Sequence, residues 1–232
     1  MLNPVFPRFA TLSDRALVVH LGDQMDTAMF RTVRSMSRQL EAKPLAGMME
    51  FVPAFTTVAV YYDPLRTSEA ELIASITKLA GMDDESTEPQ RRVVEIPVCY
   101  GGEFGADLEF VAKHTNLTPQ EVIGIHSAAD YLVHMIGFAP GFPYLGGMSS
   151  KIATPRRSSP RLKIPAGSVG IAGDQTGIYP LETPGGWQLI GRTPLELFQP
   201  NQDPPTLLQA GDVVRFRSIS PQQFRELQEQ PA

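Results

Sequence analysis

The sequence predicts an α+β protein built from two domains, an α/β domain over residues 1–88 and a β-rich domain over residues 89–232. Three observations lead to this prediction. In the first stretch, strand-like apolar runs alternate with segments that have the 3.6-residue period of a helix. In the second stretch, short apolar runs are separated by dense glycine and proline. Between them, residues 82–90 are polar and without periodicity, so we interpret them as a linker.

The overall composition excludes several classes of protein. The chain has 232 residues, of which 42% are hydrophobic and 19% charged, and its net charge is −5. An acidic chain argues against nucleic-acid binding, which selects for basic patches. No apolar run reaches about 18 residues and the N-terminus lacks the pattern of a signal peptide, so we expect neither a membrane span nor a leader. A single cysteine, Cys99, fits a reducing cytoplasm.

The first domain shows a βαββα succession of elements. Residues 15–21 and two runs within 47–62 are rich in branched and aromatic apolar residues, which is typical of strands. Between them, residues 26–42 have apolar side chains at helical spacing, and Asp26 is a suitable N-cap. A second helix is predicted over 68–81, because it opens with the Ser-x-x-Glu pattern of a capping box and ends at a glycine.

Residues 91–98, RRVVEIPV, predict a further strand whose domain the pattern does not decide. If this strand closes the first domain, the order becomes βαββαβ, the split-βαβ arrangement of ferredoxin-like folds. If it opens the second domain, the first domain ends with its second helix. Both alternatives stay open at this point.

After residue 100 the pattern of predicted secondary structure changes. Two short helices are predicted near 107–114 and 118–126, the second with a threonine N-cap followed by proline. Short strand-like runs then follow, and residues 165–191 contain seven glycines and three prolines. This pattern favours a compact β-barrel or a sandwich. The polar C-terminal segment 220–232 is expected to fray.

Most of the familiar catalytic motifs are missing. No HExxH or CxxC pattern occurs, so we expect no bound metal. Gly141 and Gly146 have the spacing of a phosphate-binding P-loop, but Gly147 and Met148 replace its lysine and hydroxyl residue. Any ATP is therefore expected elsewhere in the chain or on a partner. Around Ser168 the sequence AGSVG is out of register with a GxSxG nucleophile elbow.

One segment, GFAPGFPYLGG at 137–147, is too interrupted for a helix and too apolar for a surface linker. Its rings Phe138, Phe142 and Tyr144 need a ligand, a partner or the core to cover them. Shortly before it, His126 ends a predicted helix. A helix C-terminus stabilises an imidazolium and favours proton transfer, although a simple capping histidine is the alternative.

Two further segments supply cations and polar groups. Residues 154–161, TPRRSSPR, hold three arginines together with two prolines, which reduce the entropy lost when an arginine binds an anion. Arginine matches a carboxylate through two parallel hydrogen bonds, although a solvated basic loop is the alternative. Residues 173–188 contribute an amide, a phenol and an indole that can orient a small polar ligand or, alternatively, pack in the core. These groups belong to Gln175, Tyr179 and Trp187.

Together these segments resemble a known family. GFAPGFPYLGG, TPRRSSPR and IPAGSVGIAGDQTGIYPLETPGGWQLIGRTPLELF are similar to the signature blocks of the KipI/PxpB family, also called allophanate hydrolase subunit 1. The similarity covers nearly the whole chain and is most specific over 131–198. The resemblance implies an N-terminal ferredoxin-like α/β domain over 1–88 and a C-terminal cyclophilin-like β-barrel domain over 89–232.

The same resemblance implies a function. It predicts a cytoplasmic subunit of a hydrolase that opens the lactam 5-oxoproline to L-glutamate with ATP, together with a PxpA-like subunit and a KipA/PxpC-like subunit. ATP with Mg²⁺ is then a cofactor of the complex and is not assigned to this chain, which we expect to be inactive alone. The family leaves two alternatives: inhibition of a sensor histidine kinase, as KipI does, or an accessory role in allophanate or urea-amide hydrolysis.

A lactam site must hold the free carboxylate, polarise the amide and stabilise charge that develops on oxygen. We expect Arg156 or Arg161 to bind the carboxylate and His126 to transfer the proton. Gln175 and Tyr179 are expected to contact the ring amide. The pocket walls that exclude water are expected to be aromatic: Phe138, Phe142, Tyr144 and Trp187. The alternative is that these rings face a partner subunit, because exposed aromatic patches mark interfaces.

Overall fold

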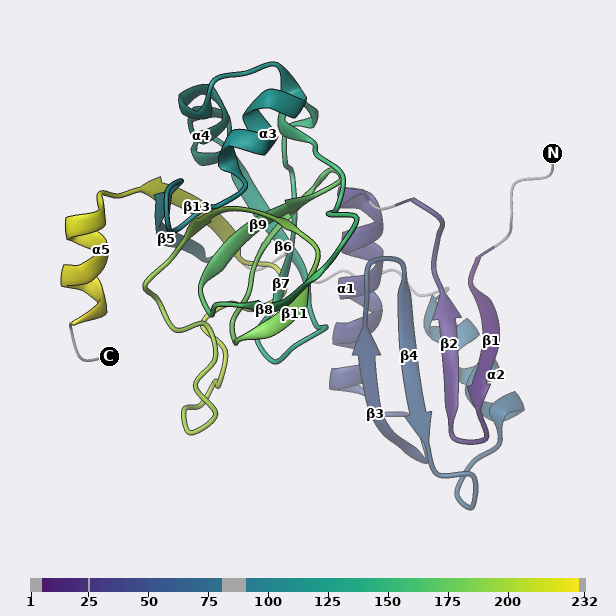
Figure 1. Cartoon of the computed structure of the whole chain (residues 1–232). Coiled ribbons are helices and arrows are strands. Elements are labelled where there is room, and N and C mark those ends of the chain that lie inside the picture. The colour runs from purple at the N-terminus through teal and green to yellow at the C-terminus, as the bar shows by residue number, and fades with distance from the viewer. Residues whose placement is uncertain (1–5, 25, 81–90, 230–232) are drawn as a thin grey trace. The chain divides into compact units, whose positions relative to one another are not determined.

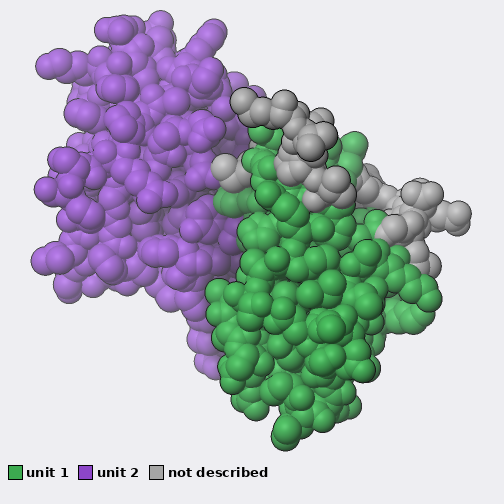
Figure 2. All heavy atoms as spheres, turned by 90° about the vertical axis from the view of Figure 1, so that its right-hand side faces the viewer, with its two compact units in different colours: residues 1–89 green, residues 90–232 purple. Residues whose placement is uncertain are grey.

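The chain forms two compact units in the computed structural model (Figure 1). Unit 1 covers residues 1–89 and unit 2 covers residues 90–232 (Figure 2). The linker expected at 82–90 and the domain boundary expected at residue 88 lie outside the described residues. The residues that the structure describes are 6–24, 26–80 and 91–229.

Unit 1 is a four-stranded antiparallel sheet that packs with two helices. The strands lie in the order β1-β2-β4-β3. Side chains such as Leu17, Val60 and Ile76 are fully buried between the sheet and the helices, and each contributes about 1.5–3 kcal/mol to folding. The elements are β1 (Arg8–Ser13), β2 (Ala16–His20), α1 (Thr27–Ala42), β3 (Met48–Pro53), β4 (Thr57–Tyr62) and α2 (Glu69–Ala80).

Both helices of unit 1 begin where the sequence predicts. Asp26 caps α1, because its carboxylate accepts a hydrogen bond from the backbone N–H of Met29 at 2.8 Å. At the start of α2, the Glu71 carboxylate accepts from the Ser68 N–H at 2.8 Å, and the Ser68 hydroxyl accepts from the Glu71 N–H at 3.3 Å. The predicted capping box is confirmed, and it pairs N–H groups that the first turn leaves free.

The strand predicted at 91–98 belongs to unit 2. As β5 (Val93–Tyr100), it pairs in parallel with β13 (Val213–Ser218) and antiparallel with β12 (Gln188–Arg192). The edge position beside β2 in unit 1 is occupied instead by β1, an N-terminal strand that the sequence pattern missed. Its half-polar sequence, RFATLS, carries little strand signal.

Unit 2 is built around a closed barrel, not a sandwich. The strands follow one another around it in the order β10-β7-β6-β13-β5-β12-β9, and β8 pairs with β11 in a separate two-stranded ribbon. Closure pairs the barrel strands on both sides, so the barrel leaves no open edge. The remaining strands are β6 (Asp130–Ile136), β7 (Pro143–Gly146), β8 (Arg161–Ile164), β9 (Ser168–Ala172), β10 (Gln175–Ile178) and β11 (Thr183–Gly185).

Besides the barrel strands, unit 2 contains helices near the start and at the end of its sequence. The two helices predicted near 107–114 and 118–126 are present as α3 (Leu108–Thr115) and α4 (Pro119–Ser127), and a short 3₁₀ turn covers Ser150–Ile152. The expectation that the C-terminal segment frays is wrong for α5 (Pro221–Gln228). That helix starts with a Ser220–Gln223 capping box and buries Phe224, whose single apolar ring outweighs the polar composition.

Aliphatic side chains make up much of the barrel interior. Val98, Ile171, Ile190 and Val214 from four different strands are fully buried, together with Val122 of α4. This core holds the strands rigidly and so positions the loops that connect them. Among the described residues, no helix has the length and apolar character needed to cross a bilayer.

Candidate functional site

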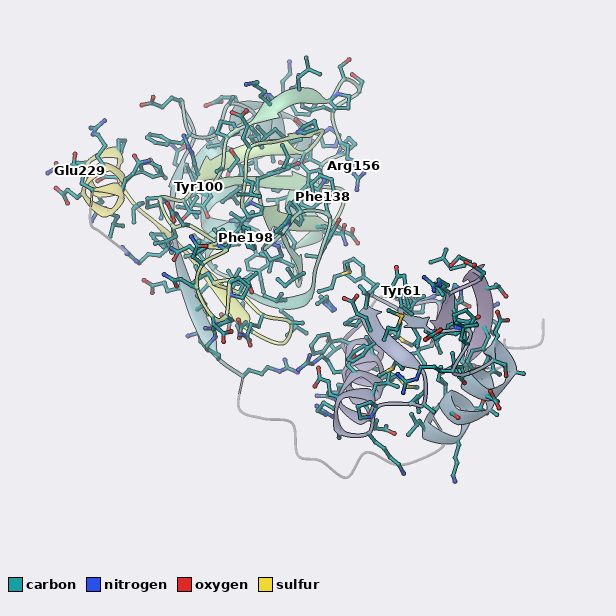
Figure 3. All side chains as sticks on the ribbon, turned by 90° about the horizontal axis from the view of Figure 1, so that it is seen from below. Tyr61, Tyr100, Phe138, Arg156, Phe198 and Glu229 are labelled. Carbon is teal, nitrogen blue, oxygen red and sulfur yellow. The ribbon has the colours of Figure 1, made fainter. Side chains whose placement is uncertain are left out.

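Six of the nine predicted site residues line one pocket on unit 2, which we call the aromatic pocket; its volume is about 290 Å³. It is formed by the β6–β7 loop, by residues 154–161, which we call the arginine loop, and by β11 with its flanking residues. Figure 3 shows Phe138 and Arg156 near each other on unit 2. The predicted residues in the lining are Phe138, Phe142, Tyr144, Arg156, Tyr179 and Trp187.

The rings of the pocket form one cluster centred on Phe142. Its ring makes edge-to-face contacts with four others, at centroid distances of 5.4 Å to Phe138, 5.0 Å to Tyr144, 5.4 Å to Tyr179 and 5.5 Å to Trp187. Aromatic pairs prefer this arrangement because the positive ring edge meets the negative ring face. The cluster is therefore a stiff apolar floor.

Most of these rings are covered by their own unit. Phe142, Tyr179 and Trp187 are buried, whereas Phe138 is 65% exposed. Phe138 also has a positive φ of 68°, which is uncommon for a residue other than glycine. Of these four rings, only Phe138 is exposed enough to face a partner subunit, while the inner three serve the core and the pocket floor at once.

The β6–β7 loop needs glycine where it approaches another segment. Gly141 has a φ of 81°, and a Cβ atom there would lie 3.1 Å from both the Leu197 carbonyl oxygen and the Phe198 Cβ. The loop closes on itself where the Gly137 N–H donates to the Phe142 carbonyl at 3.0 Å. The glycines therefore allow a tight turn that presents Phe142 inward and Phe138 outward.

Arg156 supplies the positive charge of the pocket. It is exposed, and it takes part in none of the ion pairs found among the described residues. Burial raises the pKa of Tyr179 to about 12 and also raises the pKa of Tyr144, while the charge of Arg156 opposes both shifts. Both phenols therefore keep their protons at neutral pH and act as hydrogen-bond donors beside a guanidinium.

Arg161, the other candidate for binding a carboxylate, does not line the pocket. Its two terminal nitrogens donate to the two carboxylate oxygens of Asp107, both at 2.8 Å. Asp107 also accepts from Arg157 at 3.1 Å and from the Leu189 N–H at 2.7 Å. Its side chain is only 6% exposed. Sequence reasoning missed Asp107, because its place before α3 indicates a helix cap and gives no sign of a buried charge.

His126 lies in the barrel interior and does not line the aromatic pocket. Its ring is fully buried and lies between the Tyr100 hydroxyl, 2.8 Å from Nδ1, and the Thr176 hydroxyl, 2.9 Å from Nε2. The Thr176 hydroxyl donates to the Gly170 carbonyl at 3.0 Å, so it accepts from Nε2–H, and Nδ1 accepts from Tyr100. Burial lowers the pKa of His126 to about 3, which outweighs the helix dipole and keeps the ring neutral.

Gln175 is also absent from the pocket lining. It is the first residue of β10, where it pairs with Ala172 of β9, and it is half-buried. Cys99 is buried in β5, and burial raises the pKa of its thiol, as expected for an unreactive cysteine. The described residues contain no group of three His, Cys, Asp or Glu side chains placed to hold a metal ion.

Comparison with known proteins defines the class first. The family model "Carboxyltransferase domain, subdomain C and D" matches residues 7–208. The solved structure of Kluyveromyces lactis urea amidolyase superposes with a TM-score of 0.80 over 94% of this chain and 15% of that chain; at 18% identity this shows a shared fold alone. The α/β unit and the closed barrel together are therefore a carboxyltransferase-type fold.

More similar relatives narrow the class to a family. The 5-oxoprolinase B subunit of Bacillus subtilis (strain 168) is 48% identical over 94% of this chain and 95% of its own length, and that of Escherichia coli O157:H7 is 44% identical over 88% and 93%. The chain belongs to this family, which confirms the resemblance to KipI/PxpB.

Solved structures at higher identity share the fold. The protein PH0987 from Pyrococcus horikoshii is 42% identical, with a TM-score of 0.56 over 94% of this chain and 100% of that chain. The protein TTHA0988 is 36% identical, with a TM-score of 0.78 over 89% of this chain. This chain spans only 40% of the length of TTHA0988, so the same two units also occur within a longer polypeptide.

Proposed function

We propose that this chain is the PxpB-type component of an ATP-dependent 5-oxoprolinase, and that its aromatic pocket binds 5-oxoproline for opening to L-glutamate. The observation that carries the proposal is Arg156, a cation outside the ion pairs of the described residues, set against a floor of rings. The relatives named as 5-oxoprolinase subunits indicate which carboxylated lactam the pocket takes.

The chemistry of the pocket suits each part of such a ligand. A guanidinium binds a carboxylate through two parallel hydrogen bonds, so Arg156 takes the free acid. The apolar edge of the five-membered ring lies against Phe142 and Trp187. Tyr144 and Tyr179 keep their protons and donate to the lactam oxygen, where negative charge develops as the amide is activated.

The pocket does not supply every group that ring opening needs. Among its described lining residues, none is a carboxylate or an imidazole, and His126 and Gln175 lie elsewhere. A base for the attacking water must therefore reach the ligand from outside this lining. We assign it to a partner subunit, in keeping with the expectation that this chain is inactive alone.

ATP with Mg²⁺ belongs, in this proposal, to the complex. Nucleotide phosphates are held by several N–H donors and a lysine, and their Mg²⁺ by oxygen ligands. The lining of the aromatic pocket contains one guanidinium, and the described residues contain no cluster of three metal-ligating side chains. These residues do not fit a nucleotide, so the partner subunits are the better place for it.

The subunit partners and the domain names complete the proposal. We assign a PxpA-like and a KipA/PxpC-like partner in the cytoplasm. We also assign a ferredoxin-like domain to residues 1–88 and a cyclophilin-like domain to residues 89–232. The strand order β1-β2-β4-β3 supports the first name, because β1 fills the edge place of the fourth ferredoxin strand. The closed barrel supports the second.

Reconstitution tests the function. The three subunits are mixed with 5-oxoproline and Mg-ATP, and glutamate release is measured. We expect turnover only when all three are present. Arg156→Gln should raise KM for 5-oxoproline by at least about tenfold, because the carboxylate loses its charged partner. The control is Lys163→Gln, which removes an exposed cation from β8. Lys163 forms an ion pair with Glu182 at 3.1 Å.

The outcomes separate the competing functions. If the complete mixture releases no glutamate but this chain binds a histidine kinase, the KipI-like inhibitory role is correct. If the mixture acts on allophanate or another urea-derived amide and not on 5-oxoproline, the accessory role in urea metabolism is correct. An Arg156→Gln complex with an unchanged KM would remove Arg156 from the site.

A further inference from the structure

We propose that Asp107 is the positioning residue of the aromatic pocket: it holds Arg157 and Arg161, and thereby fixes Arg156, the chain neighbour of Arg157, in the orientation that meets the ligand's carboxylate. The inference rests on the proposed function of the pocket. Asp107 itself does not line the pocket, so its action passes through the arginine loop.

Backbone and side-chain contacts anchor the first half of the arginine loop, and at its far end Arg161 of β8 pairs with Gly185 of β11. Thr154 exchanges two backbone hydrogen bonds with Gly173, at 3.1 and 2.8 Å, and the Arg157 N–H donates to the Gly186 carbonyl at 2.7 Å. The Gln188 side chain donates to the Pro155 carbonyl at 2.9 Å. Between these two anchors, residues 158–160 are exposed.

Asp107 anchors the arginine side chains of the loop. Its carboxylate receives three hydrogen bonds from two guanidiniums, with Arg161 bound through both oxygens. The Leu189 N–H, two residues from Trp187 in the chain, donates to the same carboxylate at 2.7 Å. One buried carboxylate therefore connects the start of α3, the arginine loop and the strand that follows the indole wall of the pocket.

The charge of Asp107 determines which way the arginine side chains of the loop turn. Arg157 follows Arg156 directly and Arg161 lies five positions beyond Arg156; the side chains of Arg157 and Arg161 are 35% and 26% exposed. With Asp107 present, both side chains turn toward the carboxylate, and Arg156 is the arginine of the loop that lines the pocket. Without it, two partly buried cations lose their counter-charge and must move toward water, and they carry the loop with them.

A positioning role and a purely electrostatic role predict opposite signs. Removing a negative charge near the pocket would, by Coulomb attraction alone, tighten the binding of an anion. Releasing the loop would weaken it, because a displacement of about 1 Å in a binding group costs up to about a hundredfold. We therefore expect Asp107→Asn to raise KM for 5-oxoproline at least about tenfold in the reconstituted complex, with a smaller change in kcat.

The matched control is Asp212→Asn. Asp212 is also a buried carboxylate, paired with Arg92 and accepting from the Gln209 N–H at 2.8 Å, and it does not line the aromatic pocket. The fluorescence of Trp187, the only tryptophan in the chain, gives a second readout as 5-oxoproline is titrated. Weaker binding in Asp107→Asn than in Asp212→Asn supports the proposal, and equal or tighter binding overturns it.

The rate of trypsin cleavage tests how firmly the arginine loop is held, and it needs no 5-oxoproline. The exposed Arg157–Ser158 bond should be cut several times faster in Asp107→Asn than in the wild type or in Asp212→Asn. If the wild-type complex has no oxoprolinase activity, the proposed function fails, while the cleavage rates still decide whether Asp107 holds the loop. An unchanged cleavage rate at this bond overturns the positioning role even if catalysis is confirmed.

A second pair of variants covers the case in which Asp107→Asn does not fold. Arg161→Gln removes the paired guanidinium hydrogen bonds to both oxygens of Asp107, while Arg161→Lys keeps a cation for it. We expect the glutamine variant to raise KM and the lysine variant to recover part of the loss. If both variants keep the wild-type KM, Asp107 does not position the loop.

Discussion

Arg156 and Arg161 have the same side chain and lie five positions apart, yet their surroundings give them different roles. Arg161 is held at both terminal nitrogens by Asp107, whereas Arg156 lines the aromatic pocket. Residue type and spacing named both as candidates for binding a carboxylate. The choice between them came from a third residue, Asp107, which is about 50 positions away along the chain.

At the same scale, His126 makes stability depend on pH. Its folded pKa is about 3, below the ordinary value of 6.5 that it regains on unfolding. Between these values the unfolded chain binds a proton that the folded chain does not, so stability falls as pH falls below about 6.5. His126 should therefore reduce the free energy of unfolding by about 2 kcal/mol between pH 7 and pH 5.

Urea unfolding at the two pH values measures this effect. His126→Gln should reduce the difference between pH 7 and pH 5, although it lowers stability at both. The control is His114→Gln, because His114 is exposed on α3. If His126→Gln and the wild type lose the same free energy on acidification, the neutral, buried state of His126 is wrong.

At the scale of elements, the segment around β11 makes one wall of the pocket and has no room for a side chain at Gly185. A Cβ atom there would lie 2.8 Å from the Ile164 Cδ1 and would also collide with the Tyr179 hydroxyl. The ring of Tyr179 would have to leave its position beside Phe142. Gly185 thus links the packing of β8 and β11 to the position of a proposed hydrogen-bond donor.

Gly185→Ala should therefore lower the free energy of unfolding by about 1–3 kcal/mol and raise KM for 5-oxoproline. Thermal unfolding and glutamate release measure the two effects. Gly186→Ala is the matched control, because a Cβ atom at Gly186 meets no atom closer than 3.7 Å. Equal behaviour of the two variants would contradict the packing argument.

At the scale of the whole molecule, the barrel closes with strands of unit 2 alone. β5 is both its first strand in the sequence and the one that joins β12 to β13. We expect a fragment of residues 91–232 to fold by itself, with a cooperative thermal transition in circular dichroism. A fragment of residues 101–232, which lacks β5, should not, because the barrel is left open and β12 and β13 lose a partner.

Much of the fold could be predicted from local patterns. Helix starts at Asp26, Ser68 and Thr118 were visible because a cap and the first turn lie within four residues of each other. The second domain was expected to be a barrel or a sandwich, and its strand pairing shows a closed barrel. The edge strand β1 and helix α5 were missed, since both have a weak local signal: β1 is half-polar, and α5 depends on burying Phe224 in a cluster with the distant Cys99.

The sequence by itself determined which segments make the site: the ring-rich turn, the arginine loop and the residues around Trp187 all meet at one pocket. Only the tertiary structure decided the roles within it. In the folded chain, His126 is buried inside the barrel, Gln175 lies at the start of a strand, and Asp107 contacts the arginines. The reason is physical: composition and turn chemistry act over a few residues, whereas burial and charge pairing depend on groups that meet only when the chain has folded.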